Sequence, residues 1–213
     1  MAAKAGRARG TREAILDAAE RLFGEHGVGE VSNRQVSEAA GQGNHFAVGY
    51  HFGTKADLVR EIVRRHVAAL EQRRIEMLAE IAGSPDVREW VSCLVRPATD
   101  HLASMGSPTW QARFMAQCNT DPVLRQIVID ENVAAPSMRR NLDGMFGLLH
   151  GVPAEIRKER GDMSRMLIVH VMAERERALH EGGATARATW EATAVGLIDA
   201  IVGIWLAPVT LAR

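Results

Sequence analysis

Hydrophobic residues recur at helical spacing along most of this 213-residue chain. The first apolar stripe lies on a helix that we expect to begin at Thr11 and to end at Gly27. Its members are Ile15, Leu16, Ala19, Leu22 and Phe23. We find no run with the period-two alternation of a half-buried strand, so the pattern predicts an all-α protein.

Two short helices joined by a tight turn are predicted next. Ser32 can cap the first helix, and Gln35, three residues later, can complete a capping box. Gly41 and Gly43 can take positive φ at little cost, which favours a sharp reversal of the chain. Asn44 can then cap the second helix. The two helices together predict a helix-turn-helix motif.

The second short helix, over about residues 45–51, has two different faces. At helical spacing Val48 and Phe52 fall on one face, while Phe46 and Tyr50 fall almost opposite. We therefore expect one face to pack against the protein and the other to be free to contact a partner.

Longer helices are predicted for the rest of the chain. Thr54 can cap a helix of about 27 residues that spans roughly 40 Å and connects the N-terminal helices to the C-terminal ones. The helices expected beyond it cover residues 86–104, 107–119, 121–149, 153–181 and 185–206. Pro97 should kink the first of these, and Pro136 should bend or divide the third, because proline lacks the backbone N–H that a helix needs.

Several motifs between Thr11 and Val63 occur in a fixed order. They are Ala18-Ala19, Leu22-Phe23 followed by Gly27, the capped segment Ser32–Gly41, and the closing run Tyr50-His51-Phe52-Gly53-Thr54-Lys55. This order is similar to the DNA-binding domain of the TetR family of bacterial transcriptional regulators. The chain departs from the family pattern by one extra residue between Gly41 and Phe52. It also has Gly49 where an aromatic residue that touches the DNA backbone often stands.

The distribution of charge and the resemblance to the TetR family together imply that the chain has three parts. Residues 1–10 would form a basic flexible arm, which could neutralise phosphates or remain a solvated terminus. Residues 11–56 would form the helix-turn-helix DNA-binding domain. Residues 57–213 would form a helical domain that binds an effector and pairs with a second copy, and the long helix would join the two domains.

The resemblance points to a set of DNA contacts on and around the second short helix. The residues expected near the bases are Asn44, His45, Phe46 and Tyr50. The residues expected near the phosphates are Gln42, His51, Thr54 and Lys55, and Arg34 completes the set. Asparagine can pair with adenine and phenylalanine can meet thymine methyl groups, whereas phosphate contacts position the protein without reading sequence.

The resemblance also implies a pocket for a small apolar effector near the bent helices. Large or soft side chains and two polar anchors are the candidates: Trp90, Leu94, His101, Met105, Trp110, Arg113, Phe114 and Cys118. At helical spacing such residues are more often plain core, and that alternative stays open for each of them.

The last two helices carry apolar residues on more than one face. A surface helix needs only one apolar stripe, so this breadth suggests burial on two sides. One side would face the body, and the other a partner subunit in a homodimer, as in proteins of the TetR family. The alternative is a helix buried wholly within one subunit.

Composition adds few constraints. The formal net charge is +0, so no global field indicates nucleic acid. Cys93 and Cys118 are the only cysteines and lack metal-ligand spacing, so we expect no metal, no cofactor and no disulfide framework. The apolar stretch Ala192–Pro208 is short for a membrane span and carries Asp199. We therefore expect a cytoplasmic protein without a membrane partner.

Together these features predict a ligand-responsive repressor. It would bind a palindromic DNA operator as a homodimer and be released by a small apolar effector. One alternative is an all-α enzyme that uses Asp100, His101 or His170 as acid or base, although no spacing of catalytic groups supports it, and we assign no catalytic residue. A second alternative is an interaction protein that kept the fold without DNA binding.

Overall fold

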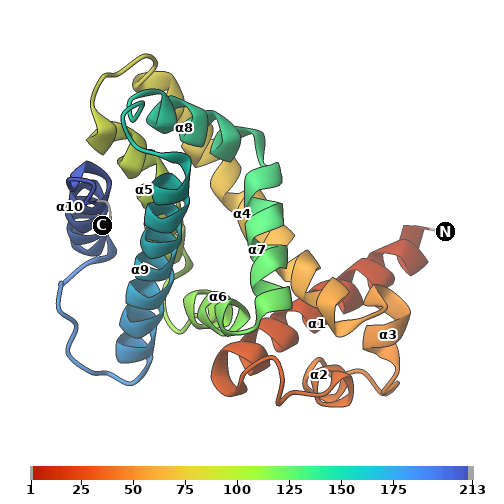
Figure 1. The fold of residues 1–213 in the computed structure, drawn as a ribbon. Coiled ribbons are helices and arrows are strands. Elements are labelled where there is room, and N and C mark those ends of the chain that lie inside the picture. Colours follow the sequence, from red (N-terminus) through yellow and green to blue (C-terminus); the bar gives the residue numbers. More distant parts are fainter. Residues whose placement is uncertain (1, 211–213) are drawn as a thin grey trace. The chain divides into compact units, whose positions relative to one another are not determined.

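The computed structural model describes residues 2–210, with side chains from residue 9 onward. Ten α-helices and no strand lie in this part of the chain, which confirms the all-α prediction (Figure 1). They are α1 (Ala2–His26), α2 (Asn33–Ala39), α3 (Ala47–Phe52), α4 (Lys55–Glu80), α5 (Val87–Met105), α6 (Gln111–Thr120), α7 (Pro122–Ala134), α8 (Pro136–Gly147), α9 (Ala154–His180) and α10 (Trp190–Leu206).

Helix α1 begins earlier than the expected start at Thr11. Its backbone is helical from Ala2, through residues that we expected to form a flexible arm. Alanine, lysine and arginine are good helix formers and outnumber Gly6 and Gly10 in this segment, which favours an early start of the helix. The side chains of Lys4 and Arg7 lie outside the described part of the chain.

Two prolines act differently on their helices. Pro136 divides the expected third body helix, and it occupies the first turn of α8, where its missing N–H costs nothing. Pro97 lies inside α5, which continues through it. Because Pro97 cannot donate to the carbonyl of Cys93 four residues earlier, Arg74 of α4 supplies the missing donor, with Nε 3.2 Å from that oxygen.

The chain forms two compact units. The first comprises residues up to His66 together with Thr109–Glu131, so α6 and most of α7 pack with the N-terminal helices. The second comprises Val67–Pro108 and the chain from Asn132 onward. Helix α4 runs from one unit into the other. Neither unit is a continuous segment of the chain. The functional division after residue 56 stays a prediction.

In the first unit, α6 packs closely on α1. The rings of Phe23 and Phe114 stack with centroids 6.3 Å apart. A side chain at Gly24 would meet the backbone oxygen of Trp110 at 3.0 Å, so glycine permits the close approach of the two helices. The indole Nε1 of Trp110 donates to Glu25 at 2.9 Å, which fixes the ring at the end of α1.

A buried charged cluster joins α1 to α4 in the same unit. The Glu20 carboxylate lies 2.5 Å from Arg65 Nη2 and 2.9 Å from His66 Nε2. Burial alone would raise the pKa of Glu20, but the hydrogen bonds and charges of His66 and Arg65 outweigh it and leave the pKa below its ordinary value of 4.5. The ionised carboxylate therefore stabilises the fold of this unit.

In the second unit, α10 packs on α5 and α9 (Figure 1). Two arginines of α9 hold the two ends of α10. Arg175 donates to the backbone carbonyls of Arg187 and Ala188, just before α10 begins. Arg160 donates to the carbonyls of Trp205 and Ala207 at 2.7 and 2.6 Å, where the last carbonyls of a helix lack partners within it. The position of α10 along α9 is thereby fixed.

Helices α5 and α8 of the second unit meet at Trp90 and Gly144. A Cβ atom at Gly144 would lie 2.1 to 2.6 Å from atoms of the Trp90 six-membered ring. Trp90 is buried, and its Nε1 donates to the carbonyl of Ser84 at 3.0 Å. The contact leaves no room for a side chain at residue 144.

Both cysteines are buried and free. Burial raises the pKa of Cys93 to about 11 and that of Cys118 to about 12. Between residues 2 and 210, no helix has the length and apolar character needed to cross a membrane.

The substitution Gly144→Ala should destabilise the second unit by about 2 kcal/mol or more, because the new methyl group overlaps the Trp90 ring. The matched change Gly147→Ala, in the same helix with no atom within 4 Å of the added carbon, should be neutral or stabilising. Urea unfolding followed by circular dichroism measures both. Equal stability of the two variants would contradict the tight α5–α8 contact.

The substitution Glu20→Gln should cost about 3 kcal/mol near pH 7, since it leaves Arg65 and His66 without their buried carboxylate. The wild type gains this stabilisation fully above pH 4.5 and loses it as the pH falls through the lowered pKa of Glu20. Unfolding measured from pH 7 to pH 3 should therefore show a smaller acid loss in Glu20→Gln. The exposed neighbour Glu13, 3.7 Å from Arg65, provides the control Glu13→Gln, which should change little.

Candidate nucleic-acid interface

The first short helix, α2, has the predicted capping box. The Ser32 hydroxyl accepts from the backbone N–H of Gln35, and the Gln35 side chain accepts from the N–H of Ser32. Of the two glycines in the following turn, only Gly41 takes a positive φ, of 68°. The prediction was therefore right for Gly41 and wrong for Gly43.

The second short helix, α3, begins later than expected, at Ala47. Asn44 is not its N-cap, because Phe46 holds that position without a side-chain cap. Instead the Asn44 Oδ1 accepts from the N–H of Phe46 at 3.0 Å, and this hydrogen bond competes with helix formation. Asn44 and His45 thus lie in the turn that leads into α3.

The two faces of α3 differ as predicted. Val48 is fully buried and Phe52 is 9% exposed, whereas Phe46 and Tyr50 are 81% and 83% exposed. Between the two rings in sequence, Gly49 has no atom within 4 Å of the position that a Cβ would take. Two large aromatic side chains therefore project from a short helix whose other face is anchored in the core.

Several polar candidates already have partners within the protein. Glu38 binds Arg34 at 2.8 Å and lies 3.5 Å from the Nδ1 of His45. The hydrogen bond from Arg34 holds the pKa of Glu38 below its ordinary value. The side-chain amide of Gln42 donates to the carbonyl of Ala40. Glu38 therefore places two expected DNA-contacting residues side by side.

Thr54 and Lys55, at the start of α4, form hydrogen bonds within the protein. Thr54 and Asp57 form a capping box: the backbone N–H of Thr54 donates to the Asp57 carboxylate at 3.2 Å, and the Thr54 hydroxyl accepts from the N–H of Asp57 at 3.1 Å. The ammonium group of Lys55 donates to the carbonyl of Val28 at 2.9 Å, which ties α4 to the loop after α1. Contacts of Thr54 and Lys55 with phosphate remain predictions.

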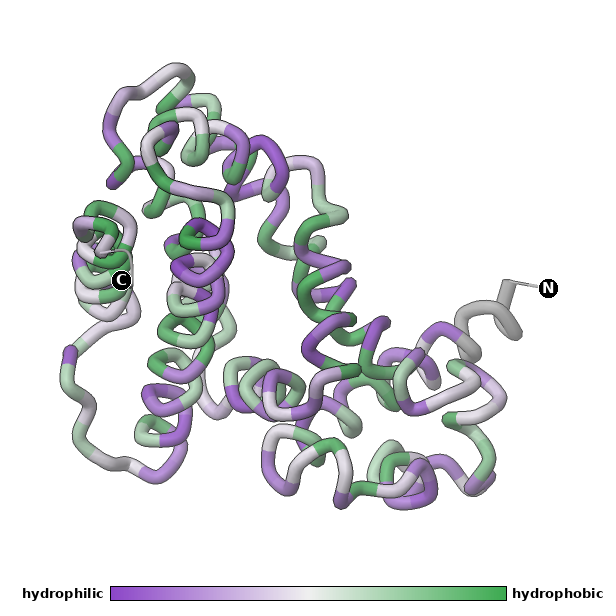
Figure 2. Tube along the Cα trace, in the orientation of Figure 1, coloured by the Kyte–Doolittle hydropathy of each residue, from purple (hydrophilic) through white to green (hydrophobic). Residues whose placement is uncertain are grey.

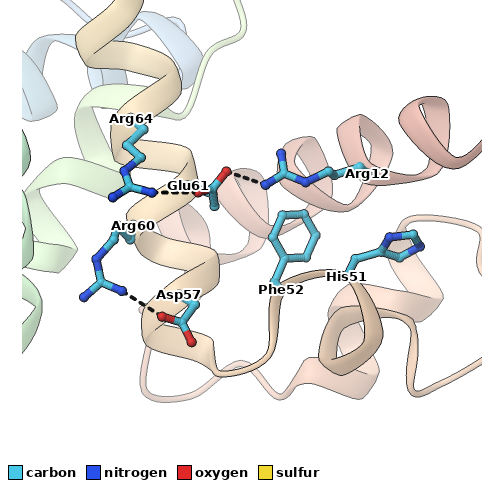
Figure 3. Close-up of a pocket in the computed structure, with 7 residues that line it drawn as sticks. All are labelled: Arg12, His51, Phe52, Asp57, Arg60, Glu61 and Arg64. Carbon is cyan, nitrogen blue, oxygen red and sulfur yellow. Dashed lines mark hydrogen bonds and ion pairs between the residues drawn. The ribbon is translucent and has the colours of Figure 1, made fainter. Parts of the chain in front are cut away.

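A polar surface pocket lies between α1, the end of α3 and the start of α4 (Figure 3). It is lined by Arg12, His51, Phe52, Asp57, Arg60, Glu61 and Arg64. The Arg12 guanidinium lies over the Phe52 ring, 4.7 Å from its centroid, and binds Glu61. Sequence reasoning did not predict this role of Arg12, because the spacing of residues along the chain does not show that Arg12 meets Phe52 and Glu61.

Ion pairs extend from this pocket to α7. Glu61 also binds Arg64, and Glu131 of α7 lies 2.9 Å from Arg64 and 3.5 Å from Arg60. The hydrogen bond from Arg12 is the largest cause of the lowered pKa of Glu61. The arginines around the pocket are therefore largely neutralised by carboxylates, and they join α1, α4 and α7 within the first unit.

The candidate effector residues are divided between the two compact units. Four lie in the first unit: Trp110, Arg113, Phe114 and Cys118. Four lie in the second: Trp90, Leu94, His101 and Met105. Phe114 and Trp90 make the core contacts described above, which fits the alternative that they are plain core. No single compact unit contains all eight, and their role in binding an effector remains a prediction.

Comparison with known proteins identifies relatives of the chain. The family model for bacterial regulatory proteins of the tetR family matches residues 15–62. The HTH-type transcriptional repressor AcnR of Corynebacterium glutamicum is 28% identical over 62% of this chain and 66% of its own length. The HTH-type transcriptional regulator BetI of Rhizobium meliloti is 30% identical over 68% of this chain and 67% of its own.

These matches span about two thirds of the length of both relatives. Among solved structures, Mycobacterium smegmatis AmtR superposes with a TM-score of 0.55 over 93% of this chain and 87% of that one. Its sequence is 20% identical, so the likeness supports the fold alone.

Proposed function

Because the chain belongs to the TetR family of bacterial regulatory proteins, we propose that it regulates transcription by binding an operator in double-stranded DNA. In this proposal α3 enters the major groove, as the second helix of a helix-turn-helix motif does. The observation that carries the proposal is a pair of exposed rings, Phe46 at the N-cap of α3 and Tyr50 within α3, opposite a face anchored in the core.

Exposed aromatic rings this large are unfavourable in water unless a partner covers them. Phe46 can contact thymine methyl groups, and Asn44 and His45 precede it in the turn, where their polar atoms can reach base edges. Gly49 leaves the surface between the rings open, so the DNA backbone can approach there. His51, Thr54 and Lys55 would bind phosphates and position the helix without reading sequence.

A homodimer is the proposed binding form. Apolar side chains remain exposed on the last two helices, among them Met163 and Met166 of α9 and Val195 and Leu206 of α10. Figure 2 shows hydrophobic residues along the trace of α10. Ile201, by contrast, is fully buried within the subunit and cannot contact a partner directly. A two-fold dimer presents two copies of α3 and so requires a palindromic operator.

We further propose repression that a small molecule relieves. The naming of AcnR as a repressor supports the sign of regulation. A predominantly apolar effector would bind in the second unit and favour a conformation with low DNA affinity. The protein would act in the cytoplasm and would not be an enzyme.

Phe46→Ala and Tyr50→Ala should each weaken binding to a selected operator by roughly 1 to 3 kcal/mol, with much less effect on random DNA. Operators can be selected from genomic fragments, and fluorescence anisotropy at fixed salt gives the affinities. Val123→Ala is the control, since Val123 is also an exposed apolar residue of the first unit but lies on α7. Unchanged operator affinity in both aromatic variants would refute α3 as the reading helix.

Leu206→Arg should convert dimers to monomers, because it places a charge on an exposed apolar position of the proposed interface. Leu206 is 60% exposed in the single subunit, so the change should not disturb its fold. Light scattering should give twice 23.3 kDa for the wild type and 23.3 kDa for the variant. Val133→Arg, on α7, is the control and should remain dimeric. A wild-type mass of one subunit would exclude the dimer.

A further inference from the structure

Helix α3 is too short to hold its own conformation. It has six residues, whereas an isolated helix needs about 12 to 15 residues to be even marginally stable in water. Its N-cap residue, Phe46, makes no side-chain capping bond, and at its other end the N–H of Gly53 donates to the carbonyl of Gly49. The orientation of its exposed face therefore depends on contacts with other helices.

Phe52, the last residue of α3, provides one of these contacts. Its ring is largely buried, and the Arg12 guanidinium lies over it, 4.7 Å from the ring centroid. A guanidinium over an aromatic face is attracted to the ring and also covers its apolar surface. Because Arg12 belongs to α1, this contact ties the end of α3 to α1.

Arg12 is itself held by α4. Its Nη2 donates to the carboxylate of Glu61, and Figure 3 shows the guanidinium between this carboxylate and the Phe52 ring. A long arginine side chain at the surface would otherwise sample many rotamers. Glu61 thus restrains the side chain that covers Phe52, and one guanidinium links α1, α3 and α4.

The ion pair also distinguishes Arg12 from a residue that binds DNA phosphates. The hydrogen bond from Arg12 is the largest cause of the lowered pKa of Glu61, so the carboxylate is charged and matches the charge of Arg12. A phosphate would have to displace this carboxylate before it could bind Arg12. The arrangement therefore favours a link between helices over a phosphate contact.

We propose that Arg12 is a positioning residue for operator recognition, which holds Phe52 and thereby fixes the orientation of Phe46 and Tyr50. Tyr50 precedes Phe52 by two residues in the same helix, so any rotation of α3 at its anchored end displaces the Tyr50 ring. Without Arg12, α3 would sample more orientations, and more entropy would be lost on binding. This inference rests on the proposed binding of DNA through α3.

The substitution Arg12→Gln removes the cation without leaving a carboxylate unpaired. Glu61 keeps its ion pair with Arg64, at 3.1 Å, so the variant should fold. Arg21→Gln is the matched control. Arg21 also lies on α1, and its side chain is 39% exposed against 38% for Arg12, but it pairs with Glu25 of its own helix.

Hydrogen exchange of the DNA-free protein, with quench-flow labelling and mass spectrometry, tests the anchor itself. The N–H groups of Tyr50 and Gly53 donate to the carbonyls of Phe46 and Gly49 at 3.0 Å. In Arg12→Gln they should exchange roughly threefold faster, as expected for the loss of one partly exposed cation–π contact. Arg21→Gln should exchange as the wild type does. Unchanged exchange of α3 in Arg12→Gln would overturn the proposal.

Glu61→Ala separates positioning from electrostatics, because the two predict opposite signs. If charge alone matters, removing an acid strengthens binding to every DNA sequence. If Glu61 holds Arg12 over Phe52, the variant should bind a selected operator roughly threefold more weakly. Glu13→Ala, which removes the acid next to Arg12 in sequence, should bind as tightly as the wild type or tighter. Unchanged or tighter operator binding by Glu61→Ala would reject the positioning role.

Arg12→Gln should lose a similar factor on the operator, with an unchanged slope of log affinity against log salt concentration. A slope smaller by about one unit would identify Arg12 as a phosphate contact and contradict the proposal. If the wild type selects no operator, the proposed function fails, whereas hydrogen exchange still decides whether Arg12 holds α3. The two failures are therefore distinguishable.

Discussion

The carbonyl of Cys93 is the constraint on which the second unit depends. Pro97 removes the N–H that would satisfy this carbonyl within α5, and an unpaired buried carbonyl is costly. Arg74 repairs the defect from α4 and reaches Ser137 of α8 with the same guanidinium. One proline thus explains why a charged residue lies in the interior. The carboxylate of Glu71 supplies the opposite charge, since it accepts from the same Ser137 hydroxyl that Arg74 binds.

Helix α4 is held by buried charge in both units. In the first unit, Arg65 and His66 bind Glu20 of α1, and in the second, Arg74 binds groups on α5 and α8. Apolar contacts alone would tolerate small shifts of the helix along its axis. Directional hydrogen bonds between buried polar groups do not, because a shift along the axis would break them and leave those groups without partners.

The spacing of apolar residues predicted the helices well, because an apolar stripe depends only on residues that are close together in the sequence. The capping box of Ser32 and the two faces of α3 were equally local and are confirmed. The association of α6 with α1 was not predictable, since a stripe shows that a helix is buried but not by which partner. Thr54 was predicted to cap α4, and the cap is present, whereas the bond of Lys55 to the carbonyl of Val28 was not predicted because the two residues lie far apart in the sequence. Arg74 gave no signal, because an isolated arginine in a helix is normally exposed.

The two arginines that fix the ends of α10 have a consequence for assembly. Each guanidinium is matched to carbonyls at one end of the helix, so sliding by a single turn would break both sets of bonds at once. The exposed apolar side chains of α9 and α10 therefore keep one mutual alignment before any encounter. A second copy would meet a surface that is already ordered, and little conformational entropy would be lost on association.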